Sequence, residues 1–268
     1  MKANPLISII TVVYNAELVL NATLNSAINQ SYKNIELVII DGGSTDNTLE
    51  VAHHFDNYIG TLVSEKDNGI YDAMNKGIKA AKGDWLYFLN AGDSFYNNQV
   101  LQSIFGNNLP MQILFIYGKV QTINEPTGVD YVTGKKVTFT DFYSHYPICH
   151  QATFTHRMAF EKIGTFSTGY KLAADTEWFV RLFKQNENNT NYINSIIAYY
   201  DIQGTTYHKR MLGYKEYLTF GDIHFPLFIA FKNRILYPII WVKVKLIRLF
   251  TGTKLFALYR KYKFKPTT

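Results

Sequence analysis

The sequence lacks the marks of several large protein classes. Its single cysteine, Cys149, excludes an internal disulfide framework, and no CxxC pair or Cys/His cluster offers a zinc site. No GxGxxG follows an expected strand and no GxxxxGK[ST] occurs, so the dinucleotide and P-loop fingerprints are missing. The chain has no internal repeat and no low-complexity linker. We therefore expect a folded protein of a reducing compartment without those sites.

Acidic residues stop near Pro226. The segment 226–268 holds ten of the 27 Lys and Arg residues and no Asp or Glu, which leaves 17 basic against 21 acidic residues elsewhere, so the basic character is local. No uninterrupted apolar run reaches the roughly 18–20 residues of a spanning helix. Apolar and basic residues instead interleave to Lys265, with Trp241 among them. This pattern predicts an amphipathic tail that lies on an anionic membrane surface.

Two further classes are disfavoured. A nucleic-acid patch would also be basic and aromatic, but the density of Ile, Leu and Phe in the tail argues against it. Met1 to Val13 has one lysine, an apolar stretch broken by Ser8 and Thr11, and no small-residue cleavage site, which is typical of a buried strand rather than a signal peptide. We expect a cytoplasmic protein, peripheral on the inner face of the cytoplasmic membrane.

The first part of the chain alternates β-rich runs with helical patterns. The expected strands are Ile7–Val13, Ile35–Ile40, Tyr58–Ser64 and Trp85–Leu89. The expected helices are Glu17–Gln30, Asn47–Phe55 and Tyr71–Ala81. This alternation predicts an α/β fold, a Rossmann-like and mostly parallel sheet with helices on both faces.

The pattern changes after residue 110. Short extended runs between Ile113 and Thr140 are separated by turn signals, which predict hairpins in or beside the sheet. Helices are expected at Arg157–Ile163 and Asp175–Lys184, and an extended stretch at Tyr192–Tyr199. We expect one domain over residues 1–225, divided into halves 1–110 and 111–225, followed by the tail 226–268.

Two carboxylates come directly after expected strands, Asp41 and Asp93. A single carboxylate in this position is usually a helix cap or a turn residue. Ligands of open α/β sheets bind beyond the carboxyl ends of the strands, so two carboxylates in this position indicate one shared crevice. Asp72, Asn75 and Lys76 share one helix face by their spacing, and an ordinary solvated first turn is the alternative.

Asp175 stands where a helix is expected to begin, which fits either a functional carboxylate or an N-cap. Trp178, Phe179 and Leu182 follow it as an apolar face. The pair His150-Gln151 precedes this segment, and core hydrogen bonding is its alternative role.

The chain resembles the family-two glycosyltransferases, inverting enzymes of the GT-A fold. The motifs that carry the resemblance are Thr11–Asn15, Gln30–Tyr32, Glu36–Thr48, Asp67–Gly77 and Phe88–Asp93. They cover about the first third of the chain. The form Asn90-Ala91-Gly92-Asp93 looks like the colanic-acid and capsular polysaccharide biosynthesis branch, which includes exopolysaccharide synthesis.

The resemblance implies transfer of a sugar from a nucleoside diphosphate-sugar to a glycan acceptor, lipid-linked if the tail docks on a membrane. It makes 1–110 the nucleotide-sugar-binding half and 111–225 the acceptor-binding half. The implied donor-binding residues are Thr11, Tyr14, Asn15, Asp41, Gly43, Ser44, Asp67, Gly69, Asp72, Asn75 and Asn90. Asp41 would accept a hydrogen bond from the base, and Thr11 and Tyr14 would line its pocket, with packing under a loop as the alternative for Tyr14.

The resemblance also implies a divalent cation, Mg²⁺ or Mn²⁺, that neutralises the diphosphate. Asp93 is the candidate ligand, and Asn90 and Gly92 stand where relatives usually carry further aspartates, so water-rich coordination is expected. His208 follows Gly204-Thr205-Thr206, in the place of a family loop over the diphosphate, and is a second candidate ligand. An ordinary surface histidine is its alternative.

On the acceptor side, Asp175 would be the base that takes the proton of the acceptor hydroxyl. Ala174 replaces the usual glutamate of the family motif. The other acceptor-side residues implied are His150, Gln151, Trp178 and Arg181.

Two other functions stay open. A sugar nucleotidyltransferase would carry a Gly-rich phosphate loop after the first strand, but Thr11–Asn15 contains no glycine. A non-catalytic nucleotide-sugar-binding scaffold of a polysaccharide assembly system is favoured if the missing acidic residues reflect decay.

Overall fold

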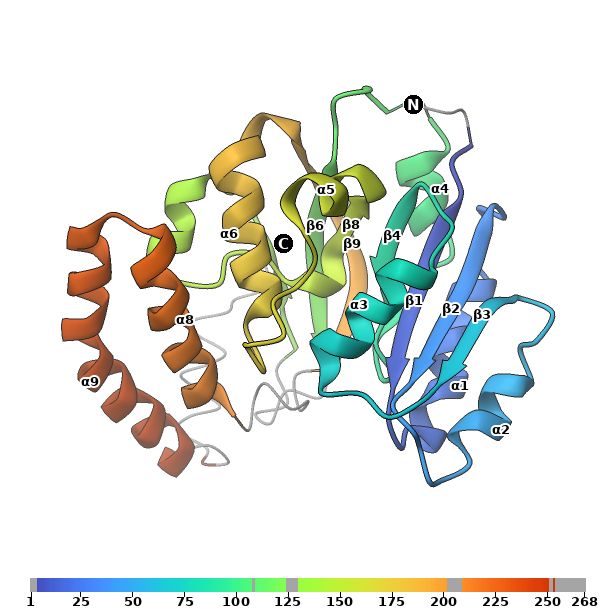
Figure 1. Ribbon diagram of the computed structural model, residues 1–268, viewed down its shortest axis with the longest axis horizontal. Coiled ribbons are helices and arrows are strands. Elements are labelled where there is room, and N and C mark those ends of the chain that lie inside the picture. The colour runs from blue at the N-terminus through green and yellow to red at the C-terminus, as the bar shows by residue number, and fades with distance from the viewer. Residues whose placement is uncertain (1–3, 108, 124–129, 202–208, 251–252, 254–268) are drawn as a thin grey trace.

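Figure 1 shows a computed structural model that describes residues 4–107, 109–123, 130–201, 209–250 and 253. The first half forms a parallel sheet. Its strands are β1 (Ile7–Val13), β2 (Ile35–Asp41), β3 (Ile59–Ser64) and β4 (Trp85–Phe88). β1 lies between β2 and β4, and all of its residues are buried, as expected for a central strand of a parallel sheet that is covered on both faces. The predicted α/β alternation is confirmed.

Helices cover both faces of this sheet and enclose two apolar cores. One face packs against α1 (Glu17–Ile28), α2 (Thr48–His53) and α4 (Val100–Phe105). The other face packs against α3 (Ile70–Ala80), α5 (Arg157–Ile163) and α6 (Ala174–Asn186). α3 lies very close to β1, because a Cβ on Gly77 would stand 2.4 Å from the Cγ2 of Ile10. The sequence did not predict α4.

The second half continues the same sheet in mixed directions. The order among the described strands is β3-β2-β1-β4-β8-β6-β9-β5, and β7 pairs with β6. These strands are β5 (Ser94–Phe95), β6 (Phe115–Ile123), β7 (Val132–Thr133), β8 (Thr153–His156) and β9 (Thr190–Asp201). β8 runs antiparallel to β4 and β6, whereas β6 and β9 are parallel. One sheet therefore joins the two halves expected from the sequence.

The segment predicted to contain hairpins contains one and then turns helical. β6 and β7 pair antiparallel, but residues Phe139–Tyr143 form the 3₁₀ helix η1. Thr138 and Asp141 close a capping box at its start, which favours a helical turn over a further strand. Two more 3₁₀ turns are η2 (His150–Ala152) and η3 (Glu187–Asn189).

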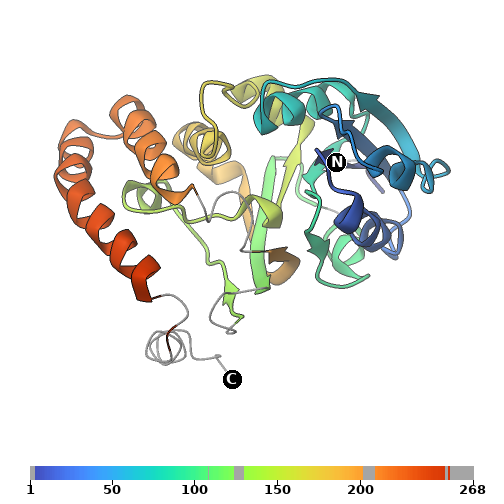
Figure 2. The same cartoon turned by 90° about the horizontal axis from the view of Figure 1, so that it is seen from below.

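Two helices end the described chain. α8 (Arg210–His224), which the sequence did not predict, and α9 (Leu227–Phe250) form a hairpin at the end of the molecule opposite β3 (Figures 1 and 2). α9 continues past Pro238, although proline cannot donate the backbone hydrogen bond of that turn. Within the described residues, no helix is both long enough and apolar enough to span a bilayer.

Candidate functional site

The carboxylate of Asp41 is bound by its own loop. Asp41 ends β2 and is fully buried. Its oxygens accept hydrogen bonds from the backbone N–H of Gly43 at 3.1 Å, from the N–H and the hydroxyl of Ser44, and from the hydroxyl of Ser64 at 2.7 Å. Gly43 has φ +84°, a conformation that glycine adopts without strain. In the described structure Asp41 therefore shapes the loop, and its expected contact with a base stays a prediction.

The end of β1 is locked to this loop. The hydroxyl of Ser44 accepts a hydrogen bond from the Asn15 N–H at 2.8 Å, and Asn15 Oδ1 accepts one from the Thr45 N–H at 2.9 Å. Asn15 has φ +50°, which Asn tolerates better than most residues. Thr11 is fully buried, and its Oγ1 has no hydrogen-bond partner among the residues that the structure describes. It therefore lies beneath the surface that a nucleotide would reach.

An aromatic ring and a carboxylate flank Gly42 on the exposed side of the loop. A Cβ on Gly42 would stand 2.4 Å from Asp67 Oδ2 and 3.6 Å from the ring of Tyr14. Tyr14 is 63% exposed, so its ring is open for stacking, and packing under a loop is not its role in this structure. The sequence placed both residues in the donor site, and the structure brings them together beside Gly42.

The polar residues around the start of α3 mainly bind one another. Asp67 accepts a hydrogen bond from the Gly69 N–H at 2.8 Å, and Asp72 accepts one from the Asn68 N–H at 2.9 Å. The Asn75 amide exchanges two hydrogen bonds with the backbone of Phe166, at 2.8 and 3.0 Å. Both ends of the Asn75 amide are thus used to join α3 to the loop before α6.

A chain of polar contacts links β4 to α6. The amide Nδ2 of Asn90 lies 3.0 Å from His150 Nε2, and His150 Nδ1 lies 3.3 Å from Asp175 Oδ2. Tyr71 donates its hydroxyl hydrogen to Asp175 Oδ1 at 3.1 Å. The side chains of His150 and Asp175 are 20% and 18% exposed, so they reach solvent. Since Ala173 is the N-cap of α6, Asp175 lies inside the helix and does not cap it.

Asp93 joins the same cluster through the neighbour of His150. Gln151 donates from Nε2 to Asp93 Oδ2 at 3.2 Å, and the Asp201 N–H donates to Oδ1 at 3.2 Å. Asp93 is buried, and burial raises its pKa to about 6, although the nearby His150 and these hydrogen bonds act in the opposite direction. The Asp201 carboxylate also raises this pKa, so a second acidic group is close. A cation beside Asp93 would stabilise its ionised form.

Among the residues that the structure describes, no group of three or more His, Cys, Asp or Glu side chains is arranged to hold a metal ion. Magnesium, however, is often bound by one or two carboxylates together with substrate phosphates and water. Asp93 fits such a site, and the buried Asn90 Oδ1, which has no partner among the described residues, is a further oxygen near it in sequence. His208 lies outside the described residues.

Two residues expected near the acceptor have structural contacts instead. Trp178 is fully buried against Phe160 and donates from its ring N–H to the Gly164 carbonyl at 2.7 Å. Arg181 binds Glu177 and the carbonyls of Ile163 and Thr165. Both side chains hold α6 against the segment that follows α5, so we leave them out of the proposed site.

Two further glutamates, Glu177 and Glu216, hold α6 and the turn that precedes it. Burial alone would raise the pKa of Glu177, but hydrogen bonds from His224 and Arg181 outweigh it and lower this pKa. Glu216 of α8 is buried and accepts three backbone N–H groups, from Lys171, Leu172 and Ala173, at 2.8 to 2.9 Å. It therefore fixes the turn from which α6 and Asp175 start.

The sequence did not predict three of these contacts: those of Tyr71 with Asp175, of Asp201 with Asp93, and of Glu216 with the turn before α6. Tyr71 is part of the motif Asp67–Gly77. The spacing of apolar residues in α3 does not predict that the Tyr71 hydroxyl contacts Asp175. Burial and the Asp175 charge raise the Tyr71 pKa well above its usual value, so this hydroxyl stays a donor. Asp201 ends an extended run, as Asp41 and Asp93 do, and that signal was available.

Comparisons with known proteins agree with this architecture. A PGL/p-HBAD biosynthesis glycosyltransferase of Mycobacterium tuberculosis is 35% identical over 205 residues, which cover 74% of this chain and 78% of that protein. An uncharacterized glycosyltransferase of Haemophilus influenzae is 34% identical over 142 residues, covering 48% of this chain and 56% of that protein. These names support glycosyl transfer, and they do not support the colanic-acid and capsule branch.

Solved structures share the fold. The S. aureus TarS fragment 1–349 in complex with UDP superposes with a TM-score of 0.65 at 19% identity, covering 82% of this chain and 65% of that one. The mannosyltransferase PcManGT from Pyrobaculum calidifontis, in complex with GDP-Man and Mn²⁺, gives a TM-score of 0.61 at 17% identity, covering 81% and 63%. The chain thus spans a little under two thirds of these structures, and at these identities the likeness shows the GT-A fold alone.

The family model described as glycosyl transferase family 2 matches residues 8–164, more than half of the chain. The matched range contains the Asp41 loop, the start of α3, Asp93 and His150, while Asp175 lies just beyond it. With the fold and the relatives in agreement, the chain belongs to glycosyl transferase family 2.

Proposed function

We propose that this glycosyltransferase moves a sugar from a nucleoside diphosphate-sugar to a hydroxyl of a glycan acceptor, with inversion at the anomeric carbon. The observation that carries the proposal is the cluster beyond β4, in which His150 contacts Asp175 and its neighbour Gln151 contacts Asp93. A carboxylate that reaches solvent is thus linked, through two adjacent residues, to a buried carboxylate suited to a cation. Asp175 would serve the attacking acceptor hydroxyl and Asp93 the leaving nucleoside diphosphate of one displacement reaction.

Asp175 is the base in this proposal. Its carboxylate takes the proton of the acceptor hydroxyl while the acceptor oxygen bonds to the anomeric carbon and the nucleoside diphosphate leaves with the electrons of its C–O bond. With the Asn90 amide donating to His150 Nε2, the imidazole carries its hydrogen on Nδ1, toward Asp175. His150 and Tyr71 therefore orient the carboxylate.

The donor base is proposed to stack on Tyr14 beside the Asp41 loop. Tyr14 is exposed, and the Asp67 carboxylate also lies beside Gly42, where it suits an N–H of a base or the hydroxyls of a ribose. Neighbours of this fold are described in complexes with UDP, UDP-GlcNAc and GDP-Man, which supports a sugar nucleotide as the donor class.

Asp93 is proposed to be the residue that would hold a divalent cation, Mg²⁺ or Mn²⁺, for the donor diphosphate. When bound, the cation would neutralise the negative charge of the leaving group. The chain's own contribution is to keep Asp93 dehydrated and oriented by Gln151 and by the Asp201 N–H. The fold neighbour PcManGT is in complex with GDP-Man and Mn²⁺, which supports this assignment.

The acceptor is proposed to be a lipid-linked glycan of surface polysaccharide synthesis, such as a capsule or exopolysaccharide, with the protein peripheral on the inner face of the cytoplasmic membrane. The basic, apolar tail 226–268 supports this location. The mycobacterial relatives are named for biosynthesis of PGL/p-HBAD, which supports a role in glycan assembly without fixing the acceptor.

A thermal-shift and turnover experiment tests the function. Purified protein is screened against UDP-, GDP-, CDP- and dTDP-sugars with and without Mn²⁺ or Mg²⁺, because a ligand of the native state raises the melting temperature. A cation-dependent shift with one nucleotide, followed by slow hydrolysis of that donor, is the expected result. Donor binding without turnover, even with membrane extract as an acceptor source, would favour the scaffold function.

A further inference from the structure

The exposed side of α9 is unusually apolar. Seven of its apolar side chains are between 48% and 86% exposed, namely Leu227, Phe228, Phe231, Ile235, Ile239, Val242 and Leu246. At about 100° per residue these positions fall within one arc of about 120°, the width of an apolar helix face. We call this set the outer stripe. A helix that packs only against its own protein would not present such a stripe to solvent.

The opposite side of α9 holds the helix to the body. Ile229, Ala230 and Val244 are buried, and Asn233 donates from Nδ2 to the Tyr143 carbonyl at 3.0 Å. Figure 2 shows α9 as the outermost element at its end of the molecule. The outer stripe therefore points away from the protein, and a flat partner can approach it along its whole length.

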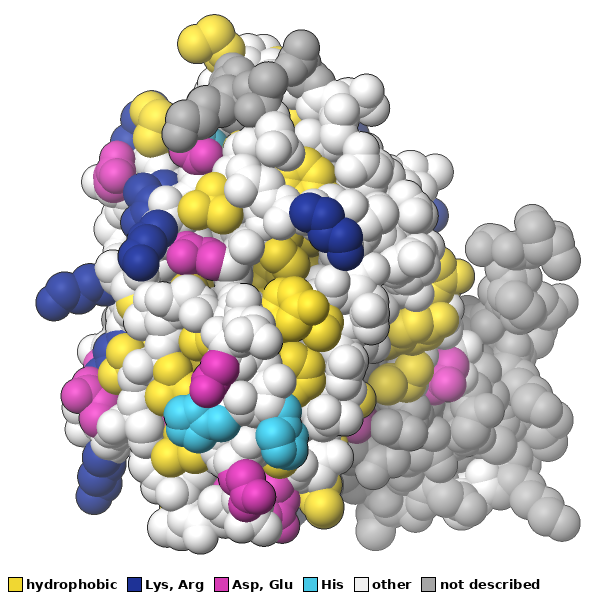
Figure 3. Space-filling view, turned by 90° about the vertical axis from the view of Figure 1, so that its right-hand side faces the viewer, with side chains coloured by type: hydrophobic (Ala, Val, Ile, Leu, Met, Phe, Trp, Pro, Cys, Tyr) yellow, Lys and Arg dark blue, Asp and Glu magenta, His cyan; other side chains and the backbone are white. Residues whose placement is uncertain are grey.

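Cations border the outer stripe on both sides. By the same helical spacing, Lys232 and Lys243 follow one edge, and Arg234 and Lys245 follow the other. All four are exposed, and Lys245 Nζ lies 3.8 Å from the centre of the Trp241 ring. Residues 226–268 contain no acidic side chain. The face at the β3 end of the molecule, by contrast, carries basic and acidic groups side by side (Figure 3).

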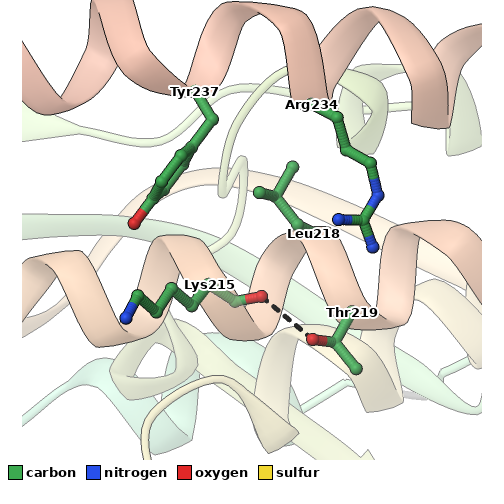
Figure 4. A pocket seen from close by; sticks show the side chains of 5 residues that line it. All are labelled: Lys215, Leu218, Thr219, Arg234 and Tyr237. Atoms are coloured by element: carbon green, nitrogen blue, oxygen red, sulfur yellow. Dashed lines mark hydrogen bonds between the residues drawn. The ribbon is translucent and has the colours of Figure 1, made fainter.

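A hollow of about 320 Å³ lies between α8 and α9, along the Arg234 edge (Figure 4). Its lining residues are Lys215, Leu218, Thr219, Arg234 and Tyr237. Asp222 pairs with Arg234 there, while Lys215 is exposed. The hollow thus offers the ammonium group of Lys215 and the hydroxyls of Thr219 and Tyr237 beside the outer stripe, a chemistry suited to phosphate oxygens.

We propose that α9 lies flat in the interface of an anionic phospholipid bilayer, with the outer stripe among the acyl chains and the bordering cations at the headgroup phosphates. Charge decides against a second copy of this chain as the occupant. Two facing copies of α9 would bring their cations together, with no acidic residue in 226–268 to pair with them. That the docked protein acts on a lipid-linked acceptor rests on the proposed function, whereas the docking itself does not.

Co-sedimentation with vesicles tests the docking, with no sugar nucleotide or cation present. The protein should bind vesicles of phosphatidylcholine and phosphatidylglycerol and should bind pure phosphatidylcholine at least about tenfold more weakly. The triple variant Phe231→Ser, Ile235→Ser, Ile239→Ser should lose about a hundredfold in affinity, because three apolar side chains no longer leave water. Since all three are exposed, folding should not suffer. Met111→Ser, at an apolar residue outside α9 that is even more exposed, is the control.

Charge and fluorescence provide independent readouts. Lys232→Glu with Lys243→Glu should weaken binding to anionic vesicles by about tenfold or more, while Lys79→Glu on α3 should not. Trp85 and Trp178 are fully buried and Trp241 is 41% exposed, so anionic vesicles should shift the emission to shorter wavelength only while Trp241 is present, and Trp241→Phe should remove the shift.

Three results would overturn the proposal: no binding of the wild type to anionic vesicles, unchanged binding of the triple variant, or a wild-type dimer in sedimentation velocity that the triple variant abolishes without any vesicle binding. Donor-induced thermal shifts in the same samples report separately on the proposed function. Docking can thus fail while the donor site is intact, and the reverse holds as well.

Discussion

Asp41 and Asp93 follow strands of one sheet and both are buried, yet their partners come from different distances along the chain. The groups that donate hydrogen bonds to Asp41, from Gly43, Ser44 and Ser64, all lie within 23 positions of it. The two donors of Asp93 lie 58 and 108 positions away, and burial leaves its pKa raised to about 6. A carboxylate satisfied by its own loop stabilises the fold, whereas one that remains costly to ionise is prepared for a ligand.

The strongest test of this contrast removes the proposed base. Asp175→Asn should lower turnover by about 10²- to 10⁴-fold, because the acceptor proton loses its carboxylate, while donor affinity stays unchanged. Turnover and calorimetric donor titration give the two quantities. Glu161→Gln, at an exposed residue of α5, is the control and should change neither. Equal losses of turnover and donor affinity in Asp175→Asn would make its role structural.

The next test separates binding from stability at Asp93. Asp93→Asn should weaken cation-supported donor binding by about a hundredfold or more, since the ionised ligand is gone. The same variant should unfold at a higher urea concentration than the wild type at pH 7.5, because the wild type must ionise a buried group. Loss of both donor binding and stability would instead place Asp93 with Asp41, as a fold-stabilising carboxylate.

The pH dependence of stability follows from the same group. In the folded protein the pKa of Asp93 is about 6, above its ordinary value of 3.8, so the folded state binds this proton more tightly. The protonated Asp93 therefore contributes its full share to the free energy of unfolding below about pH 4. This contribution, about 3 kcal/mol at most, is lost as the pH rises through about 6. Urea unfolding of the cation-free protein at pH 4.5 and 7.5, compared with Asp93→Asn, should isolate this contribution as the part that the variant lacks.

Asp41→Asn should show the opposite behaviour to Asp93→Asn. An amide in place of the carboxylate turns an N–H group toward donors of the loop, so the free energy of unfolding should fall by about 2–3 kcal/mol. Chemical denaturation measures it, with Asp56→Asn, at an exposed residue, as the control. A stable Asp41→Asn protein that no longer binds the donor would contradict the contrast and restore the direct role in base recognition expected from the sequence.

The smallest expected effect concerns the brace on α8. Glu216→Gln replaces one acceptor oxygen by a donor group opposite three backbone N–H groups, so the turn before Asp175 should shift and turnover should fall by about tenfold. Donor affinity should stay unchanged, and Glu216→Asp should recover part of the rate without improving the melting temperature. A parallel fall of donor affinity and melting temperature would indicate a purely structural role.

Local patterns predicted the parallel half of the fold well. The runs at β1, β2 and β4 are mostly apolar and almost entirely buried, and α3 has its apolar residues on one face. Local patterns did not predict α8, because its glycines and tyrosines interrupt the apolar face, nor did they predict the 3₁₀ turn at 139–143.

Candidate residues could be named from motifs, but their contacts could not. Trp178 is an example, because the sequence alone does not tell whether an aromatic residue close to the proposed base contacts the acceptor or belongs to the core. Only the packing of α6 on α5 decides for the core. For Glu216 the structural role itself was missed. A single glutamate on a helix that was not predicted gives no local sign that it binds a turn 43 to 45 positions earlier.

The bond from the Asp201 amide to Asp93 also sets an order of assembly during synthesis. Chains grow at about 5–20 residues per second, so residue 201 leaves the ribosome roughly 5 to 20 s after residue 93. During that interval the nascent chain can pair β1 to β4 and form the Asp41 loop, whose partners are all local, but Asp93 lacks its last hydrogen bond. On the proposed function, a growing chain would thus present its nucleotide surface before its cation site is complete, and sugar transfer would begin only after β9 has formed.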